Sequence, residues 1–155
     1  MLTMFFYGTL KRGGRNHGRY CGGALRVEGG AVRGGLYDLP RFGYPALVVP
    51  EESICAFGTG DFAGDAEEPG RRLGPEPLAP LEGPRVFGEI FYFDDPESRL
   101  PAIDGLEGFD PANASSHYRR VLLPVERDEG SVLLAWAYVV KESSGDYLPK
   151  GRWPP

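Results

Sequence analysis

The sequence has few of the residues on which several classes of protein depend. Its 155 residues include only two cysteines and two histidines. Cys21 and Cys55 make neither a disulfide framework nor a C-x-x-C pair, so we interpret both as buried or idle thiols. His17 and Cys21 have the i, i+4 spacing of two metal ligands, but no third ligand stands nearby. The sequence therefore predicts no metal site.

Long apolar runs are also missing. No stretch approaches the roughly 20 residues that a membrane-spanning helix needs. The first seven residues lack the basic start of a signal peptide, and their apolar run is too short for one. A composition of 41% hydrophobic and 25% charged residues is that of an ordinary globular protein. We expect a cytoplasmic protein with no membrane partner.

Positive charge is scarce as well. Seventeen lysines and arginines stand against 22 acidic residues, which gives a net charge of −5. Nucleic-acid-binding domains usually present a basic surface, so we expect no nucleic-acid partner. The one local exception is the cluster Lys11, Arg12, Arg15 and Arg19. A solvated basic turn and a ligand contact are both compatible with it.

Glycine and proline are abundant, with 23 and 15 residues. They separate short apolar segments, a pattern typical of strands joined by turns in a single domain over residues 1–155. Residues 16–22 favour a short helix. Asp95 can cap another helical turn with Pro96 at its first position, and Pro101 then opens a second short turn. The predicted strands are Thr3–Tyr7, Gly30–Tyr37, Ala46–Val49, Arg85–Phe93, Tyr118–Glu126 and Val132–Val140.

Residues 58–84 differ in composition from the rest of the chain. They are rich in glycine, proline and acidic residues, with only scattered apolar side chains. Such a segment can hardly bury enough apolar surface to order itself. We interpret it as a long surface excursion within the domain, mobile in part or folded over a site.

The segment Phe5-Phe6-Tyr7 leads directly into a glycine-rich loop that begins Gly8-Thr9-Leu10. Such a loop at the end of a strand can present backbone N–H groups to an anion or an oxyanion. It is not a P-loop, because Gly14-Arg15 stands where Lys-Ser/Thr is required. Residues 58–64 likewise miss the dinucleotide fingerprint, since the third glycine comes one residue late. We therefore expect no cofactor.

Carboxylate chemistry is the remaining possibility, because the sequence has no G-x-S-x-G motif for a nucleophilic serine. Helical spacing over residues 100–108 places Glu107 on the same face as Leu100 and Ile103. Burial there raises the pKa of a carboxyl group toward values useful for proton transfer. The alternative is that Gly105 ends the helix and Glu107 points into solvent.

In order along the chain, these segments resemble the gamma-glutamylcyclotransferase-like family, which includes the gamma-glutamylamine cyclotransferases and the AIG2-like proteins. The ordered blocks span most of the chain apart from residues 58–84. They are Phe6-Tyr7-Gly8-Thr9-Leu10-Lys11-Arg12-Gly13 with Asn16-His17, Gly35-Leu36-Tyr37-Asp38-Leu39-Pro40 with Gly43-Tyr44-Pro45-Ala46, Val86-Phe87-Gly88-Glu89-Ile90-Phe91, residues 100–108, Tyr118-Arg119-Arg120 and Ala135-Trp136-Ala137-Tyr138.

The resemblance implies a small α+β fold, with a twisted, barrel-like mixed sheet and few short helices. It implies that Tyr7-Gly8-Thr9-Leu10 lines the substrate cavity and that Glu107 is the catalytic glutamate. Tyr118 and Tyr138 are further cavity candidates, and core packing explains each of them equally well. The implied reaction is the cyclisation of a gamma-glutamyl amide to 5-oxoproline with release of an amine, and the loop residues look closest to the gamma-glutamylamine branch.

Two other functions fit the same residues. One is a non-catalytic module of this fold that binds a small ligand or a protein partner. The other is an anion site for phosphorylated metabolites at the basic loop. The identity of the amide substrate and the oligomeric state are not determined by the sequence.

Overall fold

Five strands close into a barrel-like sheet in the computed structural model, which describes residues 1–155. The strand order is β2-β6-β1-β8-β7, and β2 pairs again with β7 to close the barrel. The β1–β8 pair is parallel and the other pairs are antiparallel. Short strand β5 pairs with the first half of β7, at Val121 and Leu122, whereas β2 pairs with the end of β7. The α+β fold class predicted from the sequence is confirmed.

The barrel strands are β1 (Leu2–Phe6), β2 (Arg26–Arg33), β6 (Arg85–Phe93), β7 (Arg119–Arg127) and β8 (Val132–Val139). The remaining strands are β3 (Gly35–Leu39), β4 (Tyr44–Val48), β5 (Ala56–Phe57) and β9 (Asp146–Tyr147). The helices are α1 (His17–Tyr20), the 3-10 turn η1 (Glu51–Ser53), α2 (Phe62–Arg72) and α3 (Pro96–Glu107). None of the helices is long and apolar enough to cross a membrane.

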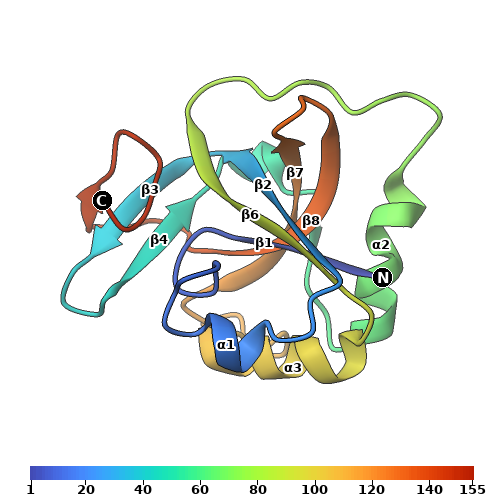
Figure 1. The fold of residues 1–155 in the computed structure, drawn as a ribbon, viewed down its shortest axis with the longest axis horizontal. Helices are drawn as coiled ribbons and strands as arrows, with labels where there is room; N and C mark the ends of the chain where they lie inside the picture. Colours follow the sequence, from blue (N-terminus) through green and yellow to red (C-terminus); the bar gives the residue numbers. More distant parts are fainter.

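A second sheet, in the order β4-β3-β9, extends from one side of the barrel (Figure 1). The sequence predicted one strand over residues 30–37, and the structure divides that stretch at Gly34 between β2 and β3. The Gly34 N–H donates to the Pro84 carbonyl (3.1 Å), so the chain leaves the barrel there. Apolar residues stand on both sides of Gly34, with Ala31 and Val32 before it and Leu36 and Tyr37 after it, so the break does not appear in the hydrophobic pattern.

The barrel strands bury both of their faces. In β1, Met4 and Phe6 pack in a layer that also holds Leu100 of α3, between the sheet and the helices. Their neighbours Phe5 and Tyr7 pack into a second cluster, which draws on all five barrel strands and fills the barrel interior. Successive strand residues point to opposite faces, so burial on both sides requires continuous apolar runs. This explains why the predicted strands had no polar alternation.

Part of the predicted surface excursion is a helix. Residues 62–72 form α2, and the Asp61 carboxylate caps it by accepting from the Gly64 N–H (3.0 Å). Asp65 and Ala66 are buried, and α2 lies beside α3. The expectation that this segment cannot order itself was therefore wrong for α2. The expectation rested on the small number of apolar residues, whereas the helix is held in place by a buried carboxylate, Asp65.

Helix α3 is continuous, whereas the sequence predicted two short turns. Asp95 occupies the N-cap position as expected, but its carboxylate binds Arg99 (3.1 and 3.0 Å) and does not cap the helix. Pro101 is exposed within the helix, and the helix continues through it. The neighbouring Leu100 is fully buried. Packing of the apolar face therefore outweighs the local cost of the proline.

Replacing Pro101 with alanine should stabilise the fold. The new N–H can bond to the Glu97 carbonyl, which a proline at position 101 leaves without its helical donor. An interior helical proline costs about 3 kcal/mol, and a more flexible unfolded chain offsets part of the gain. We expect Pro101→Ala to raise the free energy of unfolding by about 1–2 kcal/mol. Urea denaturation measures this change.

Pro96→Ala is the matched control, because Pro96 stands at the first helical position, where no N–H bond is missing. Its effect should be small. An equal gain in both variants would contradict the structural explanation.

Candidate active site

A cavity of about 360 Å³ opens beside the glycine loop, the end of α3 and the start of β7. It brings together all seven residues that the sequence singled out, which are Tyr7, Gly8, Thr9, Leu10, Glu107, Tyr118 and Tyr138. Other lining residues were not singled out as site residues, among them Arg15, Asn16, Tyr44, Pro45 and His117. The volume lies within the range of small-ligand sites, about 300–1,000 Å³.

The glycine loop presents unused hydrogen-bond donors. The backbone N–H groups of Gly8, Thr9 and Leu10 donate to no acceptor in the protein, and all three residues line the cavity. The loop is fixed from behind, because Asn16 donates through its backbone N–H to the Thr9 carbonyl (3.1 Å) and through Nδ2 to Thr9 Oγ1 (2.9 Å). A Cβ at Gly14 would lie 2.2 Å from the Thr9 oxygen, so the loop needs glycine there. Its free N–H groups can receive an anionic group.

Two residues of the basic cluster, Lys11 and Arg12, hold the loop and do not line the cavity. The Arg12 backbone N–H and Nε donate to the two carboxylate oxygens of Glu89 on β6 (2.7 and 2.8 Å). Lys11 Nζ donates to the Trp153 carbonyl (2.5 Å) near the end of the chain. Only Arg15 of the four basic residues lines the cavity, where Nη1 donates to the Gly43 carbonyl (2.5 Å). Arg15 is thus the cation available to a ligand.

Glu107 is the last residue of α3, and it lies one turn beyond the buried Ile103. The helix does not stop at Gly105. It ends at Gly108, whose φ of 70° is in the left-handed region that favours glycine. The Glu107 carboxyl group lies in the wall of the cavity, where burial and, to a smaller extent, the charge of Asp104 raise its pKa to about 7. A carboxyl group with such a pKa exchanges protons readily near neutral pH.

Three tyrosines form the wall around Glu107, and their hydroxyl groups are already engaged. Tyr7 donates to the Tyr138 carbonyl (2.6 Å), and Tyr118 donates to the Pro45 carbonyl (2.8 Å). Tyr138 donates to Asp104 Oδ1 (2.6 Å). Burial raises the pKa of all three hydroxyl groups, as do nearby carboxylates to a smaller extent. Each tyrosine is therefore neutral, packed in the core and exposed to the cavity on one side.

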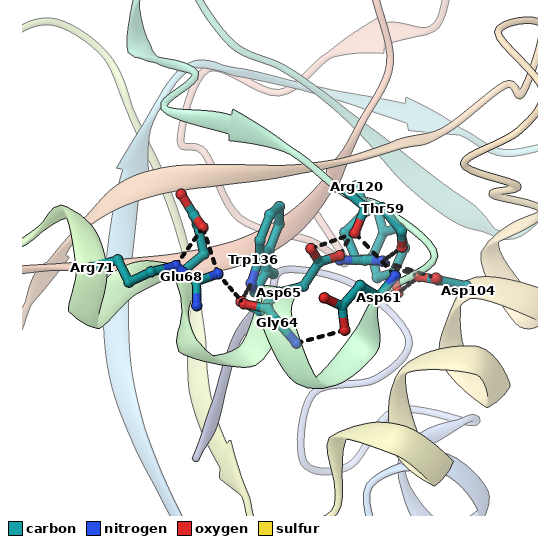
Figure 2. A network of polar contacts seen from close by, with 10 residues as sticks. Thr59, Asp61, Gly64, Asp65, Glu68, Arg71, Asp104, Arg120 and Trp136 are labelled. Atoms are coloured by element: carbon teal, nitrogen blue, oxygen red, sulfur yellow. Dashed lines mark hydrogen bonds and ion pairs between the residues drawn. The ribbon is translucent and has the colours of Figure 1, made fainter.

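Asp104 and Arg120 lie behind this wall, and the sequence reasoning gave neither a role. Arg120 is fully buried, and its Nε and Nη2 bind the two oxygens of Asp104 (2.8 and 3.2 Å). A signal was present in the sequence, because Arg120 is in phase with the apolar residues Tyr118 and Leu122 of the same strand. A charge at a core-facing strand position requires a buried partner. Figure 2 shows the pair within a larger polar network.

The described residues include no group of three or more histidine, cysteine or acidic side chains that could hold a metal ion. The site's polar groups include one carboxyl group, one arginine, Asn16, His117 and a row of backbone N–H groups. Such a set can bind an anionic group and move a proton at an adjacent atom.

A family model described as gamma-glutamyl cyclotransferase, AIG2-like, matches residues 4–60 and 71–155. No curated protein sequence matches the chain.

Three solved structures resemble the fold. An AIG2-like protein from Mus musculus is 21% identical with a TM-score of 0.56, over 93% of this chain and 80% of that one. An uncharacterized protein from Pyrococcus horikoshii is 17% identical with a TM-score of 0.55, over 99% and 90%. YkqA from Bacillus subtilis is 20% identical with a TM-score of 0.58, over 98% of this chain but 39% of that longer one. At these identities the likeness shows the fold alone.

The raised pKa of Glu107 predicts a pH-dependent cost in stability. The group is protonated in the folded state up to about pH 7 but ionises near 4.5 in the unfolded chain, so folding stability falls as the pH rises between these values. Glu107→Gln removes this cost. From about pH 5 to about pH 8, we expect the variant to gain about 2–3 kcal/mol relative to the original protein. Urea denaturation of both proteins at both pH values measures the difference, and a pH-independent difference would contradict the assignment.

Proposed function

This chain belongs to the gamma-glutamyl cyclotransferase, AIG2-like family, as its motifs predicted, and from that premise we propose that it cyclises a gamma-glutamyl amide to 5-oxoproline and releases an amine. The observation that carries the proposal is the shared cavity, in which Glu107, with its pKa of about 7, lies with the unused N–H groups of Gly8, Thr9 and Leu10. One group can move a proton and the others can hold an anion.

The substrate supplies its own nucleophile. The α-amino nitrogen of a gamma-glutamyl amide can attack the side-chain carbonyl carbon, forming the ring C–N bond, and the original amide C–N bond then breaks. The protein needs only to hold the glutamyl chain folded, which removes the cost of bringing the reacting atoms together. Well-oriented intramolecular reactions reach effective molarities on the order of 10⁵–10⁸ M. This fits a cavity that lacks a nucleophilic serine or cysteine.

Proton transfer falls to Glu107 in this proposal. The substrate nitrogen arrives as an ammonium group and must lose a proton before it can attack. Glu107 takes that proton and then delivers one to the departing nitrogen, so that the amine can leave. The α-nitrogen loses its second proton to water as the lactam forms. The released amine then takes up a proton from water. A group that serves first as base and then as acid works best when its pKa is near the working pH.

In this proposal, the glycine loop binds the negative charge of the substrate. The N–H groups of Gly8, Thr9 and Leu10 can hold either the substrate carboxylate or the oxyanion that develops on the attacked carbonyl. Arg15 adds a cation beside them. Removing one oxyanion donor typically raises the activation barrier by about 2.7–4 kcal/mol. The tyrosine hydroxyl groups bind protein acceptors, so in this proposal they shape the wall.

Replacing Glu107 by glutamine keeps the size of the side chain and removes the proton acceptor. We expect 5-oxoproline release to fall by about 10²–10⁴-fold in kcat/KM. The assay covers gamma-glutamyl-lysine, gamma-glutamyl-alanine and glutathione, so that it also identifies the leaving group; the loop motif favours the lysine compound. Glu97→Gln, an exposed change at the other end of α3, is the control. Near-normal release by Glu107→Gln would refute the mechanism, and no release from any compound by the original protein would favour a non-catalytic role.

The pH dependence of the reaction offers an independent check. If the ionised form of Glu107 accepts the proton, kcat/KM rises with pH, and its acidic limb has a midpoint near 7, the pKa of Glu107. Initial rates across the pH range locate this midpoint. An acidic limb centred near 4.5, the ordinary value for a glutamate, would contradict the assignment of Glu107 as the base.

A further inference from the structure

A polar cluster, buried except for Thr59, connects α2 to the cavity wall. We call it the Arg120 cluster, and it consists of Thr59, Asp65, Asp104, Arg120 and Tyr138. Arg120 lies at its centre and is bound on two sides. Nη1 donates to Asp65 Oδ2 on α2 (2.9 Å), and Nε donates to Asp104 Oδ1 on α3 (2.8 Å). Figure 2 shows the guanidinium group between the two carboxylates.

Asp65 is held rigidly in this position. The Thr59 backbone N–H and Oγ1 donate to its two carboxylate oxygens, each at 2.7 Å. Its backbone carbonyl accepts from Trp136 Nε1 (2.8 Å), which ties α2 to strand β8. Only 5% of Asp65 is exposed, so its charge is poorly screened by water. A carboxylate fixed in this way acts on its surroundings as a stationary charge.

The cluster carries one more negative charge than positive charge. Asp65 and Asp104 are both carboxylates, and Arg120 is their common cation. Arg120 therefore cannot neutralise Asp104 completely, because it also neutralises Asp65. Burial and, to a smaller extent, the charge of Asp65 raise the pKa of Asp104, against the opposing effect of Arg120. The cluster as a whole therefore keeps an excess negative charge, and Asp104 is its acidic member on the same helix as Glu107.

Asp104 places this negative charge next to the site. It stands three residues before Glu107 on α3, and side chains at that spacing are neighbours on one face of a helix. Tyr138 donates to Asp104 from the cavity wall, and its carbonyl accepts from Tyr7. The contacts thus run without a break from α2 to the walls that surround Glu107.

Asp65 lies in the one internal segment that the family model does not match, residues 61–70. Its role therefore comes from the contacts in this chain and not from the family pattern. We propose that Asp65 is a positioning residue for the Glu107 site. By binding Arg120 opposite Asp104, it leaves the negative charge of Asp104 incompletely neutralised beside Glu107, and this charge disfavours the ionised form of the Glu107 carboxyl group. The link to turnover rests on the proposed cyclotransferase function, whereas the effect on Glu107 does not.

The other groups near Glu107 set the background for this effect. Tyr7, Tyr118 and Tyr138 face it across the cavity, and Arg15 and His117 line the same cavity. The neutral tyrosines do not titrate near pH 7. His117 is exposed, at the edge of the cavity. Replacing Asp65 leaves all of these groups in place.

The test is a carbon-13 NMR titration of the glutamate side chains, with the Glu107 signal assigned from its loss in Glu107→Gln. Asp65→Asn keeps the shape and removes the charge, so Arg120 is left to neutralise Asp104 alone. We expect the pKa of Glu107 to fall by about 0.5–1 unit. The acidic limb of kcat/KM should move to lower pH by the same amount. A role limited to stability would lower the melting temperature without moving either midpoint.

Two variants serve as controls. Glu67→Gln removes a charge from the exposed side of the same helix and should leave Glu107 unchanged. Thr59→Val removes one hydrogen bond from Asp65 but keeps its charge, so Glu107 should titrate as in the original protein. If Asp65→Asn unfolds, all titrations are run with trimethylamine N-oxide, which strengthens folding.

The outcomes separate the two proposals. A folded Asp65→Asn protein in which Glu107 titrates as before would overturn this inference, and so would an equal shift in Thr59→Val. A shift of the Glu107 signal in a protein that releases no 5-oxoproline would refute the proposed activity and support the role of Asp65.

Discussion

One buried cation, Arg120, holds the helices and the barrel in their relative positions. It extends from β7, contacts Asp104 of α3 and Asp65 of α2, and is not exposed to solvent at all. A guanidinium group loses its hydration when it is buried, and only well-placed acceptors offset that loss. Removing one partner of such a pair typically costs about 3–5 kcal/mol. The arrangement of β7, α2 and α3 is therefore specified by charge as well as by apolar packing.

The closed barrel explains why the site forms where it does. The interior is filled by apolar side chains from all five strands. The cavity opens instead where β1 gives way to the glycine loop, beside the end of α3. Glu89 on β6 holds that loop through Arg12, so the neighbouring strand also fixes the position of the free N–H groups. Rigid strands thus support the loop backbone that forms part of the site.

Much of this was predictable from local patterns and from the family resemblance. The strands β1, β6, β7 and β8 follow from apolar runs. The helical spacing of Glu107 to Ile103 left two orientations open, and the family resemblance favoured the one in the cavity. Other features depend on contacts between residues far apart in the sequence. Asp65 and Arg120 are separated by 55 positions, and Arg12 and Glu89 by 77. No local pattern connects such pairs. The sequence did not predict helix α2 for the same reason, because its position depends on the contact between Asp65 and Arg120.

The polar residues of the cluster and the site occupy positions that the surrounding pattern would make apolar. Arg120 is in phase with the core of β7, and Asp104 and Glu107 lie on the inner side of α3. Each charge alone would destabilise the core. Together, one cation is shared by two carboxylates, and the remaining negative charge disfavours ionisation of the third acid, Glu107. Burial is the larger cause of its raised pKa and Asp104 the smaller. The same low-dielectric surroundings that make the cluster costly therefore raise the pKa of Glu107 toward neutral pH. A carboxyl group with such a pKa can both take and give a proton near neutral pH.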